Sequence, residues 1–78
     1  MMFRQARLWG NEEAVLNSAV LFTASASRGR AVYDIREAPT LDAALTFAPE
    51  LYEDRPIAIY AYDAAGRSAM LGSWVPDR

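Results

Sequence analysis

Cysteine and histidine are both absent from the 78 residues of this chain. Their absence excludes disulfides, zinc sites, thiol nucleophiles and imidazole acid–base chemistry. Lysine is absent too, since every basic residue is an arginine. No apolar run approaches the roughly 18 residues of a membrane span, and no apolar signal segment follows the arginines near the N-terminus. We therefore expect no cofactor, no metal, no membrane contact and a cytoplasmic location.

The charge balance is mild: eight basic and ten acidic residues give a formal charge of −2. That is too small to indicate a polyanionic partner or disorder caused by self-repulsion. Hydrophobic residues make up 53% of the chain, which is enough for a packed core. A chain of 78 residues is about half of a typical domain of roughly 150 residues, so residues 1–78 are predicted to form one domain.

Catalytic motifs are missing as well. The sequence contains no Gly-x-Ser-x-Gly elbow and no glycine-rich phosphate loop. The carboxylate pairs Glu12/Glu13 and Glu53/Asp54 are adjacent in sequence, so on a helix their side chains do not face a common cleft. We expect the protein not to be an enzyme.

A hairpin is predicted around the segment from Asp63 to Arg67. Aspartate opens many turns, and Gly66 stands where a left-handed residue is needed. The resulting register pairs Tyr62 with Ser68, Ala61 with Ala69, Tyr60 with Met70 and Ile59 with Leu71. One face then carries Ile57, Ile59, Ala61, Ala69, Leu71 and Val75. The opposite face carries Tyr60, Tyr62, Met70 and Trp74, and a slip of one residue would mix the two sets.

A second hairpin is predicted with its turn at Arg28-Gly29. It pairs Ser27 with Arg30, Ala26 with Ala31, Ala24 with Tyr33 and Phe22 with Ile35. The last three pairs form an apolar face together with Val20. The opposite face carries Leu21, Thr23, Ser25, Val32, Asp34 and Arg36. A shift by one residue would place Asp34 and Arg36 on the core face, and the cost of burying charge argues against it.

A helix is predicted between the hairpins. Thr40 suits its N-cap, Leu41, Ala44, Leu45 and Ala48 recur at helical spacing, and Pro49 predicts an end or a kink near Ala48, with a distorted turn over residues 50–54. Residues 1–17 fit a strand over 3–9 or a short helix from Asn11 to Leu16, packed on the sheet. The predicted fold is α+β: an N-terminal extension, then strand, strand, helix, strand, strand, with one helix on one face of an antiparallel or mixed four-stranded sheet.

The aromatic face is the most informative group. If the helix covers the isoleucine face, Tyr60, Tyr62, Met70 and Trp74 form an exposed patch typical of an interaction surface. Three alternatives stay open. The N-terminal segment could cover this face with Phe3, Leu8 and Trp9; a second copy could bury it in a homodimer; or it could stack single-stranded bases beside Arg28 and Arg30, although the negative net charge opposes that use.

Two charged groups are further candidates for partner binding. Arg28 and Arg30 at the predicted hairpin tip could grip a carboxylate or a phosphate. Glu50, Glu53 and Asp54 follow the helix, where acidic side chains oppose the helix dipole. Either Pro49 starts a new turn there or these acids serve a partner; otherwise both groups are ordinary solvated charges.

In size, mild acidity, lack of catalytic residues and predicted strand–strand–helix–strand–strand order over about residues 18–75, the chain resembles small phage-encoded anti-CRISPR inhibitors. It is similar in the same way to many small bacterial proteins rich in alanine and arginine. The first resemblance implies a protein that occludes a nucleic-acid-targeting defence complex by protein contacts or acidic mimicry. The residues that contact the complex would be Glu50, Glu53 and Asp54, or Tyr60, Tyr62 and Trp74. The expected function is thus a non-catalytic protein-binding module, with a homodimeric accessory protein or a nucleic-acid binder as alternatives.

Overall fold

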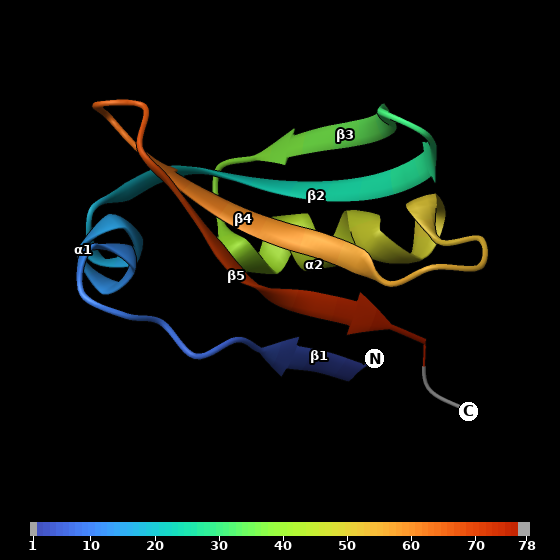
Figure 1. The fold of residues 1–78 in the computed structure, drawn as a ribbon, viewed down its shortest axis with the longest axis horizontal. Coiled ribbons are helices and arrows are strands. Elements are labelled where there is room, and N and C mark those ends of the chain that lie inside the picture. Colours follow the sequence, from blue (N-terminus) through green and yellow to red (C-terminus); the bar gives the residue numbers. More distant parts are fainter. Residues whose placement is uncertain (1, 77–78) are drawn as a thin grey trace.

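The computed structural model describes residues 2–76, which form five strands and two helices (Figure 1). In chain order these are β1 (Met2–Gln5), α1 (Asn11–Asn17), β2 (Ala19–Gly29), β3 (Val32–Ala38), α2 (Leu41–Leu51), β4 (Ile57–Asp63) and β5 (Ser68–Val75). All strand pairs are antiparallel, and the order across the sheet is β1-β5-β4-β2-β3. The α+β class and the central strand–strand–helix–strand–strand order are confirmed. The prediction of four strands and one helix missed one strand and one helix of residues 2–76.

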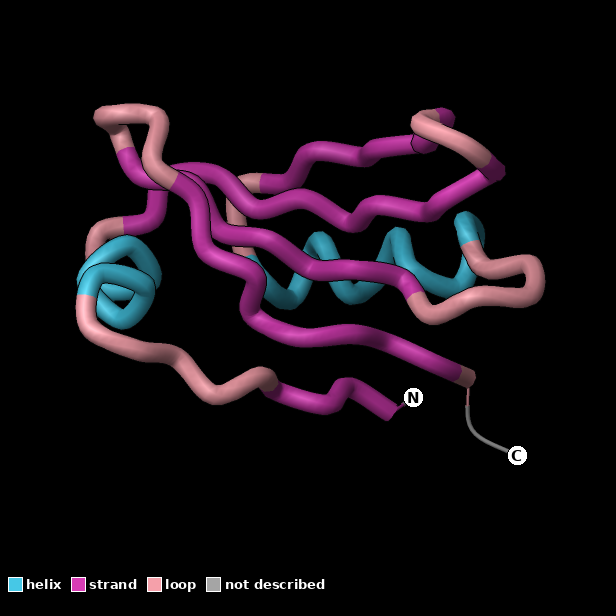
Figure 2. Tube along the Cα trace, in the orientation of Figure 1, coloured by secondary structure: helices cyan, strands magenta, loops and turns pink. Residues whose placement is uncertain are grey.

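The N-terminal residues supply both missing elements. The alternatives of strand or helix are both present, because β1 pairs with β5 at one edge of the sheet and α1 follows it (Figure 2). Leu8 and Leu16 pack against the buried core cluster, and Val15 is buried. Trp9 is 66% exposed. The segment therefore extends the sheet and closes one end of the core, and the alternative in which it covers the aromatic face is wrong.

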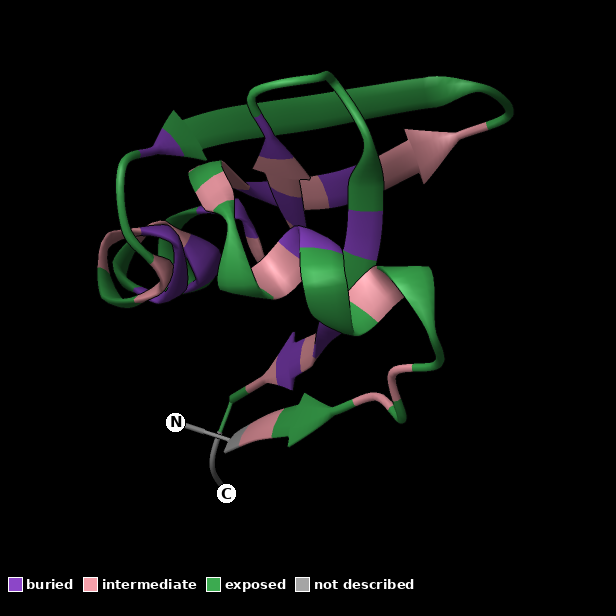
Figure 3. Ribbon diagram, turned by 90° about the vertical axis from the view of Figure 1, so that its left-hand side faces the viewer, coloured by how far each residue is buried: buried purple, intermediate pink, exposed green. Residues whose placement is uncertain are grey.

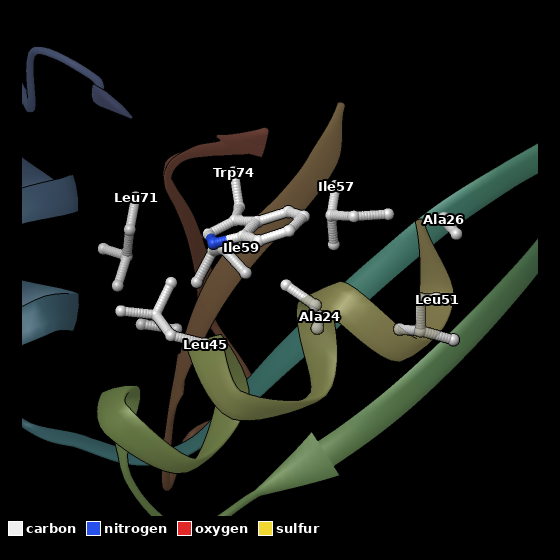
Figure 4. Close-up of a cluster of buried hydrophobic side chains, with 10 residues drawn as sticks. Ala24, Ala26, Leu45, Leu51, Ile57, Ile59, Leu71 and Trp74 are labelled. Atoms are coloured by element: carbon white, nitrogen blue, oxygen red, sulfur yellow. The ribbon is translucent and has the colours of Figure 1, made fainter. Parts of the chain in front are cut away.

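Helix α2 covers one face of the sheet (Figure 4). The predicted N-cap is confirmed, since Thr40 Oγ1 accepts a hydrogen bond from the amide of Ala43 at 3.1 Å. The helix continues past Pro49 to Leu51, so of the two predicted effects of Pro49, an end or a kink near Ala48, the end is wrong. Leu45, Ala48 and Leu51 face a cluster that includes Ile57 and Ile59, which are 1% and 0% exposed. This layer is the hydrophobic core.

The hairpin between β4 and β5 begins as predicted. Tyr62 pairs with Ser68, Ala61 with Ala69 and Tyr60 with Met70. Asp63 closes the turn: its carboxylate accepts from the amides of Ala65 and Arg67 at 3.0 and 2.9 Å and from Arg67 Nε at 2.7 Å. Burial alone would raise the pKa of Asp63, but the hydrogen bonds from Arg67, its charge and the bond from Ala65 together lower it.

A β-bulge then changes the faces of β5. Ile59 pairs with Gly72 instead of Leu71, so Leu71 is an extra residue in the strand. From this point the alternation is reversed: Trp74 pairs with Ile57 and is only 4% exposed, inside the core. The prediction that Trp74 lies on the open face beside Tyr60 was therefore wrong, and so was the placement of Val75 on the core face.

The hairpin between β2 and β3 differs most from its prediction. The turn is Arg30-Ala31, with Ala31 in the left-handed region at φ 56°, and Arg28 lies in a bulge between Ser27 and Gly29. Ala24 consequently pairs with Arg36 instead of Tyr33, a shift of three residues that exchanges the two faces of β3. The observed register is not the rejected shift of one residue, but it places Asp34 and Arg36 on the helix side, as that shift would have done. Its cost is small because β3 is an edge strand whose charged side chains stay exposed.

Candidate functional site

The face of the sheet opposite α2 carries a groove of about 340 Å³. Its position follows from the register of three neighbouring strands. The central strand β2 presents small hydroxyl side chains on this face, while β3 and β4 present larger ones. Neighbouring strands lie about 4.8 Å apart, so a row of small residues between two rows of large ones leaves a trough. The lining residues are Thr23, Ser25, Tyr33, Ile35, Tyr60 and Tyr62.

Aromatic side chains form the walls of this groove. Tyr60 and Tyr62 stand two residues apart on β4, with ring centroids 6.4 Å apart and an angle of 33° between the rings. Tyr33 and Ile35 on β3 are 58% and 56% exposed. Figure 3 shows β3 as an almost wholly exposed strand at one edge of the sheet. The corrected register thus adds Tyr33 and Ile35 to the surface that the sequence had assigned to Tyr60 and Tyr62.

The floor of the groove contains a hydroxyl group without a partner. Thr23 lies between Glu37 and Tyr60 in the sheet and is 4% exposed. Its Oγ1 atom makes no hydrogen bond with any described residue. An unpaired buried hydroxyl costs about 1–3 kcal/mol. Oγ1 has almost no accessible surface, so a ligand recovers that energy only if the side chains that cover Thr23 move aside. None of the six lining residues is charged, whereas five of them carry a hydroxyl group. The groove therefore suits an uncharged ligand rich in hydrogen-bonding groups.

The other predicted site residues do not all gather here. Met70 is 39% exposed on the same face and pairs with Tyr60, as predicted. Trp74 lies in the core, where its ring meets that of Tyr52 edge to face at 5.9 Å. Arg30 is an exposed residue of the β2–β3 turn. These placements restrict the predicted aromatic site to Tyr60, Tyr62 and Met70.

Arg28 is engaged within the chain. Its guanidinium donates to Asp34 at 2.7 Å and to the carbonyl of Leu51 at the end of α2 at 2.7 Å, and it lies 3.1 Å from Glu53. The hydrogen bond to Asp34 is the largest of the effects that raise the pKa of Arg28. Burial opposes it, and the negative charge of nearby Glu53 raises the pKa further. Arg28 thus holds the end of α2 against the β2–β3 hairpin. The prediction that Arg28 stands at the hairpin tip was wrong.

The acidic residues after α2 have a related arrangement. Glu50 lies 3.7 Å from Arg36, and Glu53 is paired with Arg28. Arg36 also lies over the ring of Phe47 at 4.7 Å. The arginines of β2 and β3 therefore offset the unfavourable placement of acids at a helix C-terminus. Sequence reasoning missed these pairs because they depend on the corrected β3 register; Asp54 is exposed.

Comparison with protein families, curated proteins and solved structures finds no match. The function is therefore argued from the surface itself. None of the helices within residues 2–76 is long and apolar enough to cross a membrane. The same residues contain no cluster of three or more acidic side chains that could hold a metal ion. The candidate site is the groove over β2, between β3 and β4.

Proposed function

We propose that the chain is a non-catalytic protein-binding module whose binding site is the groove on the open face of the sheet. The observation that carries the proposal is an uncharged groove walled by Tyr33, Tyr60 and Tyr62, with the unpaired hydroxyl of Thr23 buried beneath its floor. Tyrosine offers a large contact area with few rotatable bonds, and serine and threonine add hydrogen bonds, which is the composition of many protein-binding surfaces. The lack of charge favours an uncharged, extended segment of the partner.

The resemblance to anti-CRISPR inhibitors makes this proposal more specific: the module would cover a surface of a bacterial defence complex. Protein contact through the groove is the better supported route. Acidic mimicry has less support, because Glu50 and Glu53 are paired with arginines of the same chain. The alternative of base stacking also has little support. Arg28, its predicted cationic partner, binds Leu51 and Glu53 beside α2 and is absent from the groove lining.

Removing the aromatic wall tests the proposal. A double variant, Tyr60→Ser with Tyr62→Ser, is expected to lose at least about 2 kcal/mol of binding free energy, or roughly 30-fold in affinity, because interface tyrosines often dominate binding. Partner segments can be selected from a displayed peptide library on the wild type and then measured on both proteins by calorimetry. The selected peptides should be poor in charged residues.

Val20→Ser is the matched control, since Val20 is 60% exposed and apolar but does not line the groove. It should bind the selected peptides as the wild type does. Failure to select any peptide, or peptides that bind the double variant equally well, would contradict the proposal. The inhibitor role is tested separately by interference assays against defence nucleases, in which the wild type should protect target DNA and the double variant should not.

Replacing Thr23 by valine gives a prediction with opposite signs for stability and binding. Thr23→Val removes an unpaired buried hydroxyl while keeping nearly the same shape, so the free protein should become more stable, by up to about 1–3 kcal/mol. If a ligand bonds to this hydroxyl, the affinity for the selected peptides should fall by about 2- to 10-fold, the value of one ordinary hydrogen bond. Chemical denaturation and calorimetry measure the two effects. Ser25→Ala is the comparison variant, because Ser25 also lines the groove but is only partly buried. An affinity that is unchanged by Thr23→Val would remove Thr23 from the binding site.

A further inference from the structure

Strand β3 is an open edge of the sheet. It pairs with β2 alone, and within residues 2–76 no strand lies along its other side (Figures 1 and 3). Six of its seven residues are exposed, and Val32, Tyr33 and Ile35 are exposed by 55–58%. Unpaired edges with exposed apolar residues are templates for another strand, and proteins usually protect them with charged residues, with proline, with bulges or with a covering loop. β3 contains no proline, and its charged residues Asp34, Arg36 and Glu37 are of both signs, so a strand with complementary charges can still pair with it.

The order of these charges makes β3 complementary to itself. When two copies of β3 run antiparallel with Ile35 opposite Ile35, Asp34 of each copy stands opposite Arg36 of the other. Both pairs lie on the side of the sheet that carries α2, since Asp34 and Arg36 are the partners of Ala26 and Ala24 in the core. On the open side, Tyr33 stands opposite Glu37, which can accept a hydrogen bond from the phenol. Opposite charges directly across two strands are favourable, and like charges are unfavourable.

Other symmetric registers lack this complementarity. A centre at residue 34 places Asp34 opposite Asp34, and a centre at residue 36 places Arg36 opposite Arg36. Registers centred between two residues would set a residue of one face opposite a residue of the other, which a twofold axis normal to the sheet does not produce. The register centred on Ile35 is therefore the only symmetric one that combines matched faces with two opposite-charge pairs.

We propose that two copies of this chain associate through β3, about a twofold axis at Ile35, into a continuous ten-stranded antiparallel sheet. The side chains of Asp34 and Arg36 are 59% and 48% exposed, so both can reach a second copy while they keep their contacts to Arg28 and Glu50. The association is isologous, as expected for a twofold dimer. It also places the two open-face grooves on one side of the sheet, next to each other. The proposal does not depend on the ligand of those grooves.

Charge exchange tests the proposal. Sedimentation equilibrium of the wild type should show a dimer whose population rises with concentration, as is typical of a small interface. Asp34→Arg places like charges in both pairs, and so does Arg36→Asp. The dimer affinity of each variant alone should therefore fall by at least about tenfold. An equimolar mixture of the two should form a heterodimer with opposite charges in both pairs, which native mass spectrometry distinguishes by mass. A folding defect in either variant would not be repaired by mixing.

A second pair of variants avoids the ion pairs within the chain. Ile35→Arg and Ile35→Glu each place like charges at the twofold axis, whereas their mixture places opposite charges there. Three results would overturn the proposal. One is a wild type that stays monomeric up to about 1 mM, the range of very weak association. Another is mixtures that associate no better than the single variants. The third is a dimer that is lost in Tyr60→Ser with Tyr62→Ser but kept in the charge variants, which would place the contact on the open face.

Discussion

Gly72→Ala is expected to separate β1 from β5 or to unfold the chain. Gly72 pairs with Gln5 on β1 and with Ile59 on β4, next to the bulge at Leu71. A Cβ atom on residue 72 would meet the carbonyl oxygen of Arg4 directly and would lie 2.9 Å from its carbonyl carbon. These are backbone atoms, which cannot turn aside as a flexible side chain can. Gly72 also has φ 155°, which other residues rarely adopt.

The expected loss is about 3 kcal/mol or more. Overpacking against rigid atoms costs about 1–3 kcal/mol, and an unusual backbone conformation costs a similar amount. Unfolding in urea measures the total. Hydrogen exchange locates it, because the amide of Ala6 donates to the carbonyl of Leu71 at 2.7 Å and should lose its protection if β1 detaches.

Gly66→Ala is the matched control. Gly66 has a positive φ of 85°, but nothing lies within 4 Å of the position of an added Cβ. This variant should lose only about 1–2 kcal/mol through its left-handed backbone and should keep β1 protected. Equal losses for the two variants would show that the close approach of β1 to Gly72 does not hold in solution.

The local sequence signals predicted the elements that depend on neighbouring residues. The turn from Asp63 to Arg67 is closed by the side chain of its first residue, and the start of α2 is closed by Thr40. Both depend on contacts over two to four residues, so the residue types alone indicate them. The alternation of Tyr60 and Tyr62 with buried Ile59 and Ala61 is equally local, and it placed the tyrosines on the correct face.

The errors arose where distant contacts decide the register. The bulge at Leu71 has one local signal that the predicted register left unused: Gly72, an isolated glycine inside a strand, a position that often marks a bulge or a close backbone approach. The β2–β3 register depends on Arg28, whose three partners lie in β3, at the end of α2 and just after it. Charges on the core side of β3 would be costly only if α2 covered that strand completely. Because β3 is the edge strand, its charges are exposed and that cost is small.

These corrections also redefine the candidate site. Trp74, which the sequence placed on the aromatic surface, lies in the core, whereas Tyr33 and Ile35 belong to that surface. The role of Thr23 could not be predicted, because its burial depends on large neighbours contributed by two other strands. A variant designed from the sequence alone, with both Tyr62 and Trp74 replaced, would have confused loss of binding with loss of folding.

Trp74→Ala is expected to destabilise the protein by about 3–5 kcal/mol, the usual cost of removing a large aromatic side chain from a core. Trp74 is 4% exposed and lies beside Ile57 and Ile59, facing α2 (Figure 4). Such a loss is a large part of the total stability of a small domain. The variant should therefore unfold at much lower urea concentration than the wild type, whatever its effect on binding.

Two comparison variants separate burial in the core from exposure on the open face. Met70→Ala changes an open-face residue of the same strand and should cost below about 1 kcal/mol. Trp74→Phe should cost less than Trp74→Ala because the phenyl ring keeps most contacts with the isoleucines. Both variants remove the indole N–H, which has no partner among the described residues, so this group does not distinguish them. If Trp74→Ala were as mild as Met70→Ala, Trp74 would lie on the open face and the bulge at Leu71 would be wrong. A large loss that phenylalanine mostly restores requires the reversed alternation, and with it a binding face made by Tyr33, Tyr60 and Tyr62 without the tryptophan.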